Sequence, residues 1–149
     1  MKNTELLQTA EGLLQIQPNQ LAIMSNASAF LMSSLEKLNW VGFYLYDGEN
    51  LNVGPFQGNV ACATIELGKG ICGESAVSLK TMVVDDVINY NNHIACDSNS
   101  RSEVVIPILI KDQLFGVLDV DSPILDRFDL QTVDFLEQFV KLLVKTIDI

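Results

Sequence analysis

Basic residues are scarce in this 149-residue chain. It has 9 Lys plus Arg against 19 Asp plus Glu, which gives a formal net charge of −10 and a pI near 4.3. Nucleic acids and anionic membrane surfaces are bound through basic faces, so neither is an expected partner. Long apolar runs are also lacking, since none approaches the roughly 20 residues of a membrane-spanning helix. Residues 1–5 lack the apolar segment of a signal peptide, so we expect a cytoplasmic protein.

Cysteines are few, and their spacing disfavours two common arrangements. No pair among Cys62, Cys72 and Cys96 shows the two-residue gap of a zinc knuckle or of a thioredoxin-type motif. Zinc would need a fourth ligand, which only His93 could supply, and the spacing makes this the less favoured interpretation. Thiols are kept reduced in the cytoplasm, so we do not expect a permanent disulfide framework.

Apolar residues are plentiful, and their periodicity predicts the elements. At 48% hydrophobic and 19% charged, the chain can bury a core, and its length fits a single domain over 1–149. The predicted helices cover about 6–14, 19–38, 71–79 and 129–147, and the predicted strands cover 40–46, 51–56, 61–67, 82–84, 103–110 and 114–120.

Hairpins between consecutive strands favour a mainly antiparallel sheet. The predicted fold class is therefore α+β, with the terminal helices on one face of the sheet and loops over a ligand pocket on the other. The stretch 85–101 is rich in Asn, Asp and Ser. We interpret it as a long loop, and loops of this length inside a compact domain are usually functional or disordered.

The spacing of the carboxylates is the most informative local feature. Side chains alternate along a strand, so Asp119 and Asp121 share one face with Phe115 and Val117. These two acids would therefore point to the same side of the sheet, near the end of the last predicted strand.

A third carboxylate joins them if the preceding loop has three residues, 111–113. Glu103 would then lie directly opposite Asp121, with Asp119 one diagonal away, whereas a loop of two or four residues would turn Glu103 to the other face. Like charges directly opposite each other destabilise a sheet, so this corner would need a bound cation, an ammonium ligand or a shared proton. The alternative is three solvated acids at strand ends.

The three cysteines fall in different predicted settings. Cys96 lies in the polar loop, where a thiol would be accessible and able to react. Cys72 begins a helix, whose dipole favours a thiolate. Cys62 begins a strand and is either a core residue or a partner thiol. An accessible thiol with others within reach of a mobile loop is the layout of a redox cysteine with a resolving partner. His93 could act as a base for Cys96, although a histidine in an Asn-rich loop is more often solvated.

Two further features have a structural and a functional interpretation. Residues 68–73 match G-x-G-x-x-G, but a dinucleotide site needs a parallel βαβ unit and an acid about 20 residues further on. Asp85 and Asp86 come too early for that, so we interpret the glycines as a tight turn into a helix. Trp40 begins a strand, where an aromatic side chain belongs to the core or forms the wall of a small apolar pocket.

Four segments carry a family resemblance. They are Trp40-Val41-Gly42-Phe43-Tyr44, Gly68-Lys69-Gly70-Ile71-Cys72-Gly73, Cys96-Asp97 followed by Ser102-Glu103-Val104-Val105-Ile106-Pro107, and Gly116-Val117-Leu118-Asp119-Val120-Asp121-Ser122. Together they resemble a GAF domain and, more narrowly, the free methionine-(R)-sulfoxide reductases. The cysteine spacing combined with the three acids is specific to that enzyme group, and ordinary GAF sensor domains lack it.

The resemblance implies a GAF fold, usually a homodimer, that acts on free methionine sulfoxide and not on protein-bound methionine. At the matching positions Cys96 would be the nucleophile that becomes a sulfenic acid, Cys62 the main resolving thiol and Cys72 an auxiliary thiol. The family is recycled by thioredoxin, which is therefore the expected reductant. No metal and no nucleotide cofactor is expected.

The same resemblance implies roles for the remaining site residues. Glu103, Asp119 and Asp121 would bind the polar groups of the substrate, with Asp121 as the candidate acid, and Trp40 would pack on its S-methyl end. Two alternatives are a GAF small-molecule sensor whose cysteines are incidental and a cation-binding protein that uses the three carboxylates.

Overall fold

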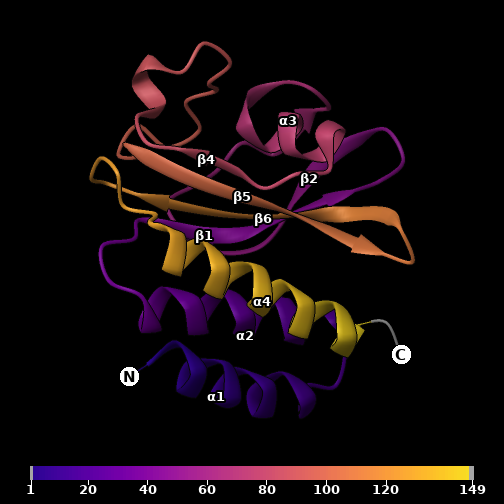
Figure 1. Ribbon diagram of the computed structural model, residues 1–149. Coiled ribbons are helices and arrows are strands. Elements are labelled where there is room, and N and C mark those ends of the chain that lie inside the picture. The colour runs from indigo at the N-terminus through magenta and orange to yellow at the C-terminus, as the bar shows by residue number, and fades with distance from the viewer. Residues whose placement is uncertain (1, 148–149) are drawn as a thin grey trace.

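The computed structural model describes residues 2–147 and has helices on both faces of one curved sheet (Figure 1). The elements in chain order are α1 (Asn3–Gln15), α2 (Gln20–Ser34), β1 (Trp40–Tyr46), β2 (Asn50–Gly58), β3 (Thr64–Glu66), α3 (Gly70–Ser78), β4 (Met82–Val84), the 3-10 helix η1 (Val87–Asn89), β5 (Ser102–Ile110), β6 (Gln113–Ser122) and α4 (Leu130–Ile147). The strand order is β3-β2-β1-β6-β5-β4, and every neighbouring pair is antiparallel. The predicted α+β architecture is confirmed.

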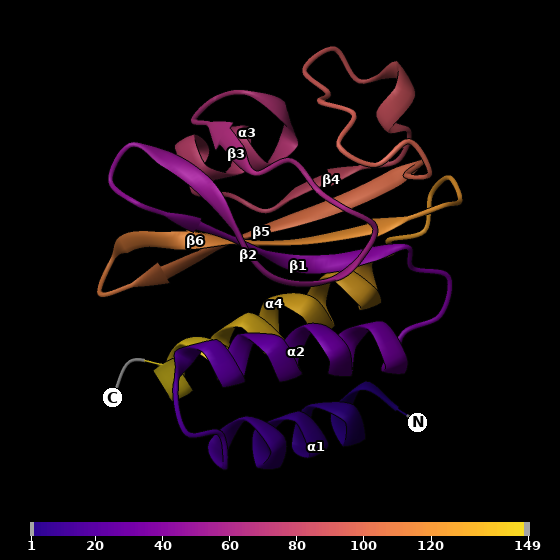
Figure 2. The same ribbon diagram turned by 180° about the vertical axis from the view of Figure 1, so that it is seen from behind.

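The terminal helices form the layer below the sheet. In both views α2 and α4 lie against the strands, and α1 lies beneath them as an outer layer (Figures 1 and 2). The main core lies between this layer and the sheet and includes the fully buried side chains of Leu31, Leu118 and Phe139. No helix within residues 2–147 is long and apolar enough to cross a lipid bilayer.

The helix boundaries follow local capping. The Asn19 side chain accepts a hydrogen bond from the amide of Ala22 (2.9 Å) and starts α2, and the Asp129 side chain accepts one from Thr132 (2.8 Å) at the start of α4. Side-chain caps of this kind satisfy amides that have no partner within the helix. The predicted continuation of the second helix to residue 38 is wrong, because Leu35 is already extended.

The other face of the sheet is covered by α3 and by the segment 85–101, which lie side by side above the strands in Figures 1 and 2. The segment contains η1 and is otherwise irregular, in agreement with the predicted loop. A second, smaller core lies under this cover and includes Trp40, Tyr44, Cys72 and Val117. The ligand side of the fold therefore has its own apolar packing.

The β5–β6 hairpin turn is shorter than predicted. It has two residues, Lys111 and Asp112, and both have positive φ (52° and 63°). Positive φ at both central positions is the backbone of the two-residue turn that matches the natural twist of a hairpin. The predicted three-residue loop is therefore wrong.

A β-bulge next to this turn compensates for the missing residue. Ile108 pairs with Gly116, whereas Leu109 pairs with Leu114, so Phe115 is the extra residue on β6. Phe115 packs against the helix-side core, and its predicted position on the face of the acids is wrong. A bulge changes the register by one residue, so the shorter turn and the bulge cancel beyond this point.

Candidate functional site

Three carboxyl groups meet on the upper face of the sheet. Glu103 on β5 is directly opposite Asp121 on β6, as predicted, and Asp119 pairs with Val105 one diagonal away. The three side chains are only 7%, 7% and 6% exposed, respectively. The alternative of solvated acids at strand ends is therefore wrong.

Burial governs the electrostatics of these acids. It raises the pKa of Asp119, of Asp121 and of Glu103, and the negative neighbours raise the first two further. Within residues 2–147, the Oδ1 atoms of Asp119 and Asp121 are buried without a hydrogen-bond partner. Buried carboxylate oxygens without a partner are costly, so this cluster suits a bound proton or a cationic group of a ligand.

Trp40 and its aromatic neighbours form one wall of the site. The Trp40 indole is 2% exposed and stacks on Tyr44 and Phe56, with ring centroids 5.8 and 5.1 Å apart. Its Nε1 donates a hydrogen bond to the carbonyl of Asn59 (3.1 Å). This arrangement fixes an apolar surface beside the carboxyl groups.

Gly42 creates the space for this packing. It lies on β1 opposite Asp119, and a Cβ atom there would come within 2.2 Å of Cβ of Phe56 and 2.8 Å of the Trp40 ring. A larger residue would therefore displace the aromatic wall.

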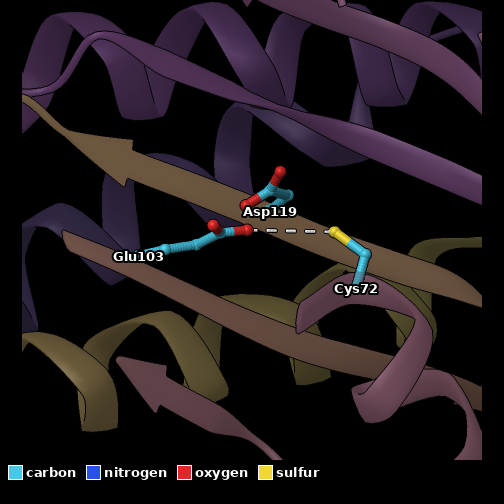
Figure 3. Close-up of side chains that lie close together, drawn as sticks. All are labelled: Cys72, Glu103 and Asp119. Atoms are coloured by element: carbon cyan, nitrogen blue, oxygen red, sulfur yellow. Dashed lines mark hydrogen bonds between the residues drawn. The ribbon is translucent and has the colours of Figure 1, made fainter. Parts of the chain in front are cut away.

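Cys72 enters the carboxyl cluster from above. Its thiol lies in the first turn of α3 and donates a long hydrogen bond to Oε2 of Glu103 (4.0 Å), next to Asp119 (Figure 3). Burial and the charge of Asp119 raise the pKa of this thiol well above its usual value. The expected thiolate is therefore wrong, because burial among acids outweighs the helix dipole. One donor atom each from Cys72, Glu103 and Asp119 lies within 4.8 Å of the others, a spacing that could hold a metal ion.

The glycine motif positions Cys72. Gly68 and Gly70 have positive φ (82° and 66°), and the Gly68 amide donates to the carbonyl of Gly73 (3.0 Å). A Cβ on Gly73 would lie 2.7 Å from the carbonyl oxygen of Glu66. The interpretation of these glycines as a tight turn into a helix is confirmed.

The other two cysteines form a disulfide, Cys62–Cys96. Cys96 is therefore half-buried and bonded in this state, not a free accessible thiol. The pairing agrees with the one that the family resemblance implies. Cys62 lies just before β3, and its carbonyl accepts a hydrogen bond from the hydroxyl of Tyr44 (3.2 Å). Burial and the charge of Asp119 raise the pKa of Tyr44, so its hydroxyl stays protonated and donates.

Cys96 and the carboxyl groups line one cavity. This cavity of about 30 Å³ is also lined by Cys72 and by His93, whose pKa is lowered by partial burial. An adjoining cavity of about 20 Å³ lies between Trp40, Cys96 and the two aspartates of the cluster. These volumes admit water but no amino acid, so a ligand of that size requires the covering loop to move.

Two asparagines that the sequence analysis missed hold the covering loop. Asn39 Nδ2 donates to Oδ2 of Asp97 (2.9 Å) and to Oγ of Ser100 (3.0 Å). The Asn92 side chain accepts a hydrogen bond from the Gly70 amide (3.1 Å) and so ties the loop to the glycine turn. These contacts join residues far apart in the sequence, and neither has a local signal.

Tyr44 was also missed as a site residue, although a signal for it exists. It lies four residues after Trp40 on β1, so alternation places both on the same face of the sheet. The side chains predicted from the sequence, Trp40, Cys72, Cys96 and the three acids, all line one or both of the two cavities. Cys62 lines neither and reaches the site through its disulfide.

Residues 20–147 match the family model of the GAF domain. The chain belongs to the GAF domain family. This GAF domain is similar to the free methionine-R-sulfoxide reductase of Escherichia coli, with 42% identity over 127 residues that cover 85% of this chain and 77% of that protein.

Solved structures agree with this family assignment. The fRMsr of Staphylococcus aureus in complex with substrate is 45% identical to this GAF domain, with a TM-score of 0.93 and coverage of 98% of this chain and 95% of that one. The free methionine-R-sulfoxide reductase of Neisseria meningitidis in complex with its substrate is 37% identical, with a TM-score of 0.94 and coverage of 98% and 88%.

Proposed function

We propose that this GAF domain reduces free methionine-(R)-sulfoxide to methionine with electrons from its thiols. The observation that carries the proposal is that Cys96, already paired with Cys62, lines the same cavity as three buried carboxyl groups. The relatives that bear the name of this activity, and the two similar structures with substrate, support the same chemistry.

The carboxyl groups supply the proton that the reaction needs. A thiolate can attack a sulfoxide sulfur only if the oxygen is protonated or strongly hydrogen-bonded as the S–O bond breaks. Burial raises the pKa of Asp121 well above its ordinary value, which suits this carboxyl to hold and donate a proton. We assign the acid to Asp121 and the nucleophile to Cys96.

The last step of the reaction forms the disulfide that the structure contains. The oxygen leaves the substrate sulfur and Cys96 becomes a sulfenic acid, which condenses with the Cys62 thiol to give the disulfide and water. The sum is one sulfoxide and two thiols converted to one thioether, one disulfide and one water. Cys72, held protonated beside Glu103, would be an auxiliary thiol.

The unpartnered oxygens of Asp119 and Asp121 define the selectivity for a free amino acid. A carboxylate that keeps its charge would bind the substrate ammonium, with Glu103 completing the cluster. A methionine inside a polypeptide has no ammonium group and would leave a buried charge unpaired, so it would be rejected. Trp40 would pack on the S-methyl group.

Other properties stay predictions from the sequence and the resemblance. These are a single domain over residues 1–149, a homodimer, a cytoplasmic location and thioredoxin as the reductant. Neither a metal nor a nucleotide cofactor enters the proposed reaction.

The experiment is an epimer-resolved turnover assay. The purified protein is incubated with dithiothreitol and each epimer of free methionine sulfoxide, and methionine is quantified by chromatography. We expect turnover of the R epimer only, and none of N-acetylmethionine sulfoxide amide, which lacks the ammonium. Binding of methionine sulfoxide without turnover would instead support the sensor alternative.

A further inference from the structure

We propose that four uncharged side chains around the Cys62–Cys96 disulfide form the docking surface for a protein dithiol reductant of the thioredoxin class. This collar consists of Val60, Ala63, Ile94 and Ala95. The proposal rests on the proposed function, because a cycle that ends in a disulfide needs a dithiol to reopen it. The docking proposal goes beyond that function, because it specifies where the reductant binds and which sulfur the reductant attacks.

The collar is exposed at the disulfide itself. Val60 is 87% exposed and Ile94 41% exposed, and both alanines are also exposed. Each of the four lies within two residues of Cys62 or Cys96, whose Cα atoms are 5.3 Å apart. The apolar side chains therefore sit at the rim of the bond that has to be reduced.

The collar also lies in two stretches of this acidic chain that carry no charged residue. Residues 51–65 and 87–96 contain no Asp, Glu, Lys or Arg, although the chain carries a net charge of −10. Asp97 follows Cys96 directly, but its carboxylate accepts the hydrogen bond of Asn39 and lines the cavity. An uncharged apolar patch on an otherwise acidic surface favours a partner whose own reactive cysteine is surrounded by apolar side chains.

The position of the two sulfurs decides the point of attack. Cys96 lines both cavities of the site, and Cys62 lines neither of them. The Tyr44 hydroxyl also holds the backbone of Cys62 in place. A reductant that approaches from outside therefore meets Cys62 first, with Val60 and Ala63 beside it.

The exchange conserves atoms and electrons. A thiolate of the reductant attacks Sγ of Cys62, the Cys62–Cys96 bond breaks, and Cys96 leaves as a thiolate that remains at the cavity. The second thiol of the reductant then attacks the mixed disulfide and releases Cys62. Two electrons pass to this domain, and the reductant is oxidised to its own disulfide.

The test compares two electron sources on one variant. In Val60→Glu we expect kcat/KM for thioredoxin to fall about tenfold or more, because a charge then lies in the centre of the contact. Turnover with dithiothreitol, which needs no docking surface, should stay unchanged. The matched control is Leu130→Glu, an 89% exposed residue at the start of α4 below the sheet, which should change neither rate.

A trapping experiment identifies the attacked sulfur. A thioredoxin whose second active-site cysteine is replaced by serine cannot release its mixed disulfide, so peptide mapping should find it bonded to Cys62. A bond to Cys96, or a Val60→Glu variant that loses both activities equally or neither, would overturn the proposal. Absence of dithiothreitol-dependent turnover in the unaltered protein would instead refute the proposed function.

Discussion

Glu103 and Asp121 face each other across β5 and β6 as directly opposed, buried carboxyl groups. Two charged groups in this position would repel each other in a medium that screens them poorly. Burial raises the pKa of both carboxyl groups, and the charge of Glu103 raises that of Asp121 further, so the free site favours a proton on the cluster. The same proton is what the oxygen of a sulfoxide needs.

The first prediction concerns stability and pH. Because the pKa of Asp119 is raised in the folded protein, its contribution to stability is complete at low pH and is lost as the pH rises through the raised pKa. The free energy of unfolding should therefore fall as the pH rises from the ordinary aspartate value of 3.8 through the raised pKa. Asp119→Asn should flatten this dependence and be more stable at the upper end by on the order of 1 kcal/mol, while it loses activity.

Urea unfolding of both proteins across this pH range measures the effect. Glu11→Gln, at an exposed position on α1, is the matched control and should keep the pH dependence of the unaltered protein. Equal pH dependence in Asp119→Asn and the unaltered protein would contradict the raised pKa.

The second prediction separates the roles of the disulfide cysteines. Cys96→Ser should abolish methionine formation, because it removes the nucleophile. With thioredoxin as the reductant, Cys62→Ser should form about one methionine per reduced protein and then stop, because its sulfenic acid lacks the main resolving thiol and the auxiliary thiol of Cys72 is held protonated. Quantifying product per protein distinguishes the two, and retained turnover in Cys96→Ser would move the nucleophile to Cys72.

The third prediction concerns the reactivity of Cys72. After reduction, iodoacetamide near neutral pH should label Cys62 and Cys96 well before Cys72, since only thiolates react and burial raises the pKa of this thiol. Mass spectrometry of timed samples follows each site. A urea-unfolded sample gives the reference rates. Labelling of all three cysteines at one rate in the native protein would show that Cys72 is neither buried nor protonated as described.

The fourth prediction concerns Tyr44. Tyr44→Phe removes the hydrogen bond to the Cys62 carbonyl, so we expect the free energy of unfolding to fall by about 1 kcal/mol and disulfide formation to slow severalfold. Quenched samples after one addition of substrate give the rate. Tyr46→Phe is the control, since its hydroxyl donates a hydrogen bond to the nearby Gly48 carbonyl in an exposed turn. Equal rates in the two variants would exclude the proposed positioning of Cys62.

Periodicity predicted the sheet well because each strand alternates between two environments. The residues 40–46 and 82–84 were predicted as strands with the observed bounds. The face of Glu103 was predicted correctly, although the prediction assumed a three-residue turn that is wrong. Glu103 still pairs with Asp121 because the bulge at Phe115 restores the register. Nothing in the residue types Lys111 and Asp112 requires two consecutive positive φ angles.

Tertiary environment explains the remaining errors. The helix dipole, which lowers the pKa of the Cys72 thiol, is a local effect that the sequence reveals. Burial beside Glu103 and Asp119 raises this pKa, and it comes from strands more than 30 residues away in the sequence. The same holds for the contact between Asn39 and Asp97, which is invisible until both ends of the loop are placed.

The bulge at Phe115 restricts how this hairpin can change in length. Removal of that single residue would turn every later side chain of β6 to the opposite face of the sheet. Both aspartates would then point into the apolar layer above α2 and α4, while Leu118 and Val120 would face α3 and the segment 85–101. Lengthening the turn by one residue would do the same. Only a one-residue insertion combined with a one-residue deletion between Leu109 and Gly116 would leave the acids where a ligand can reach them.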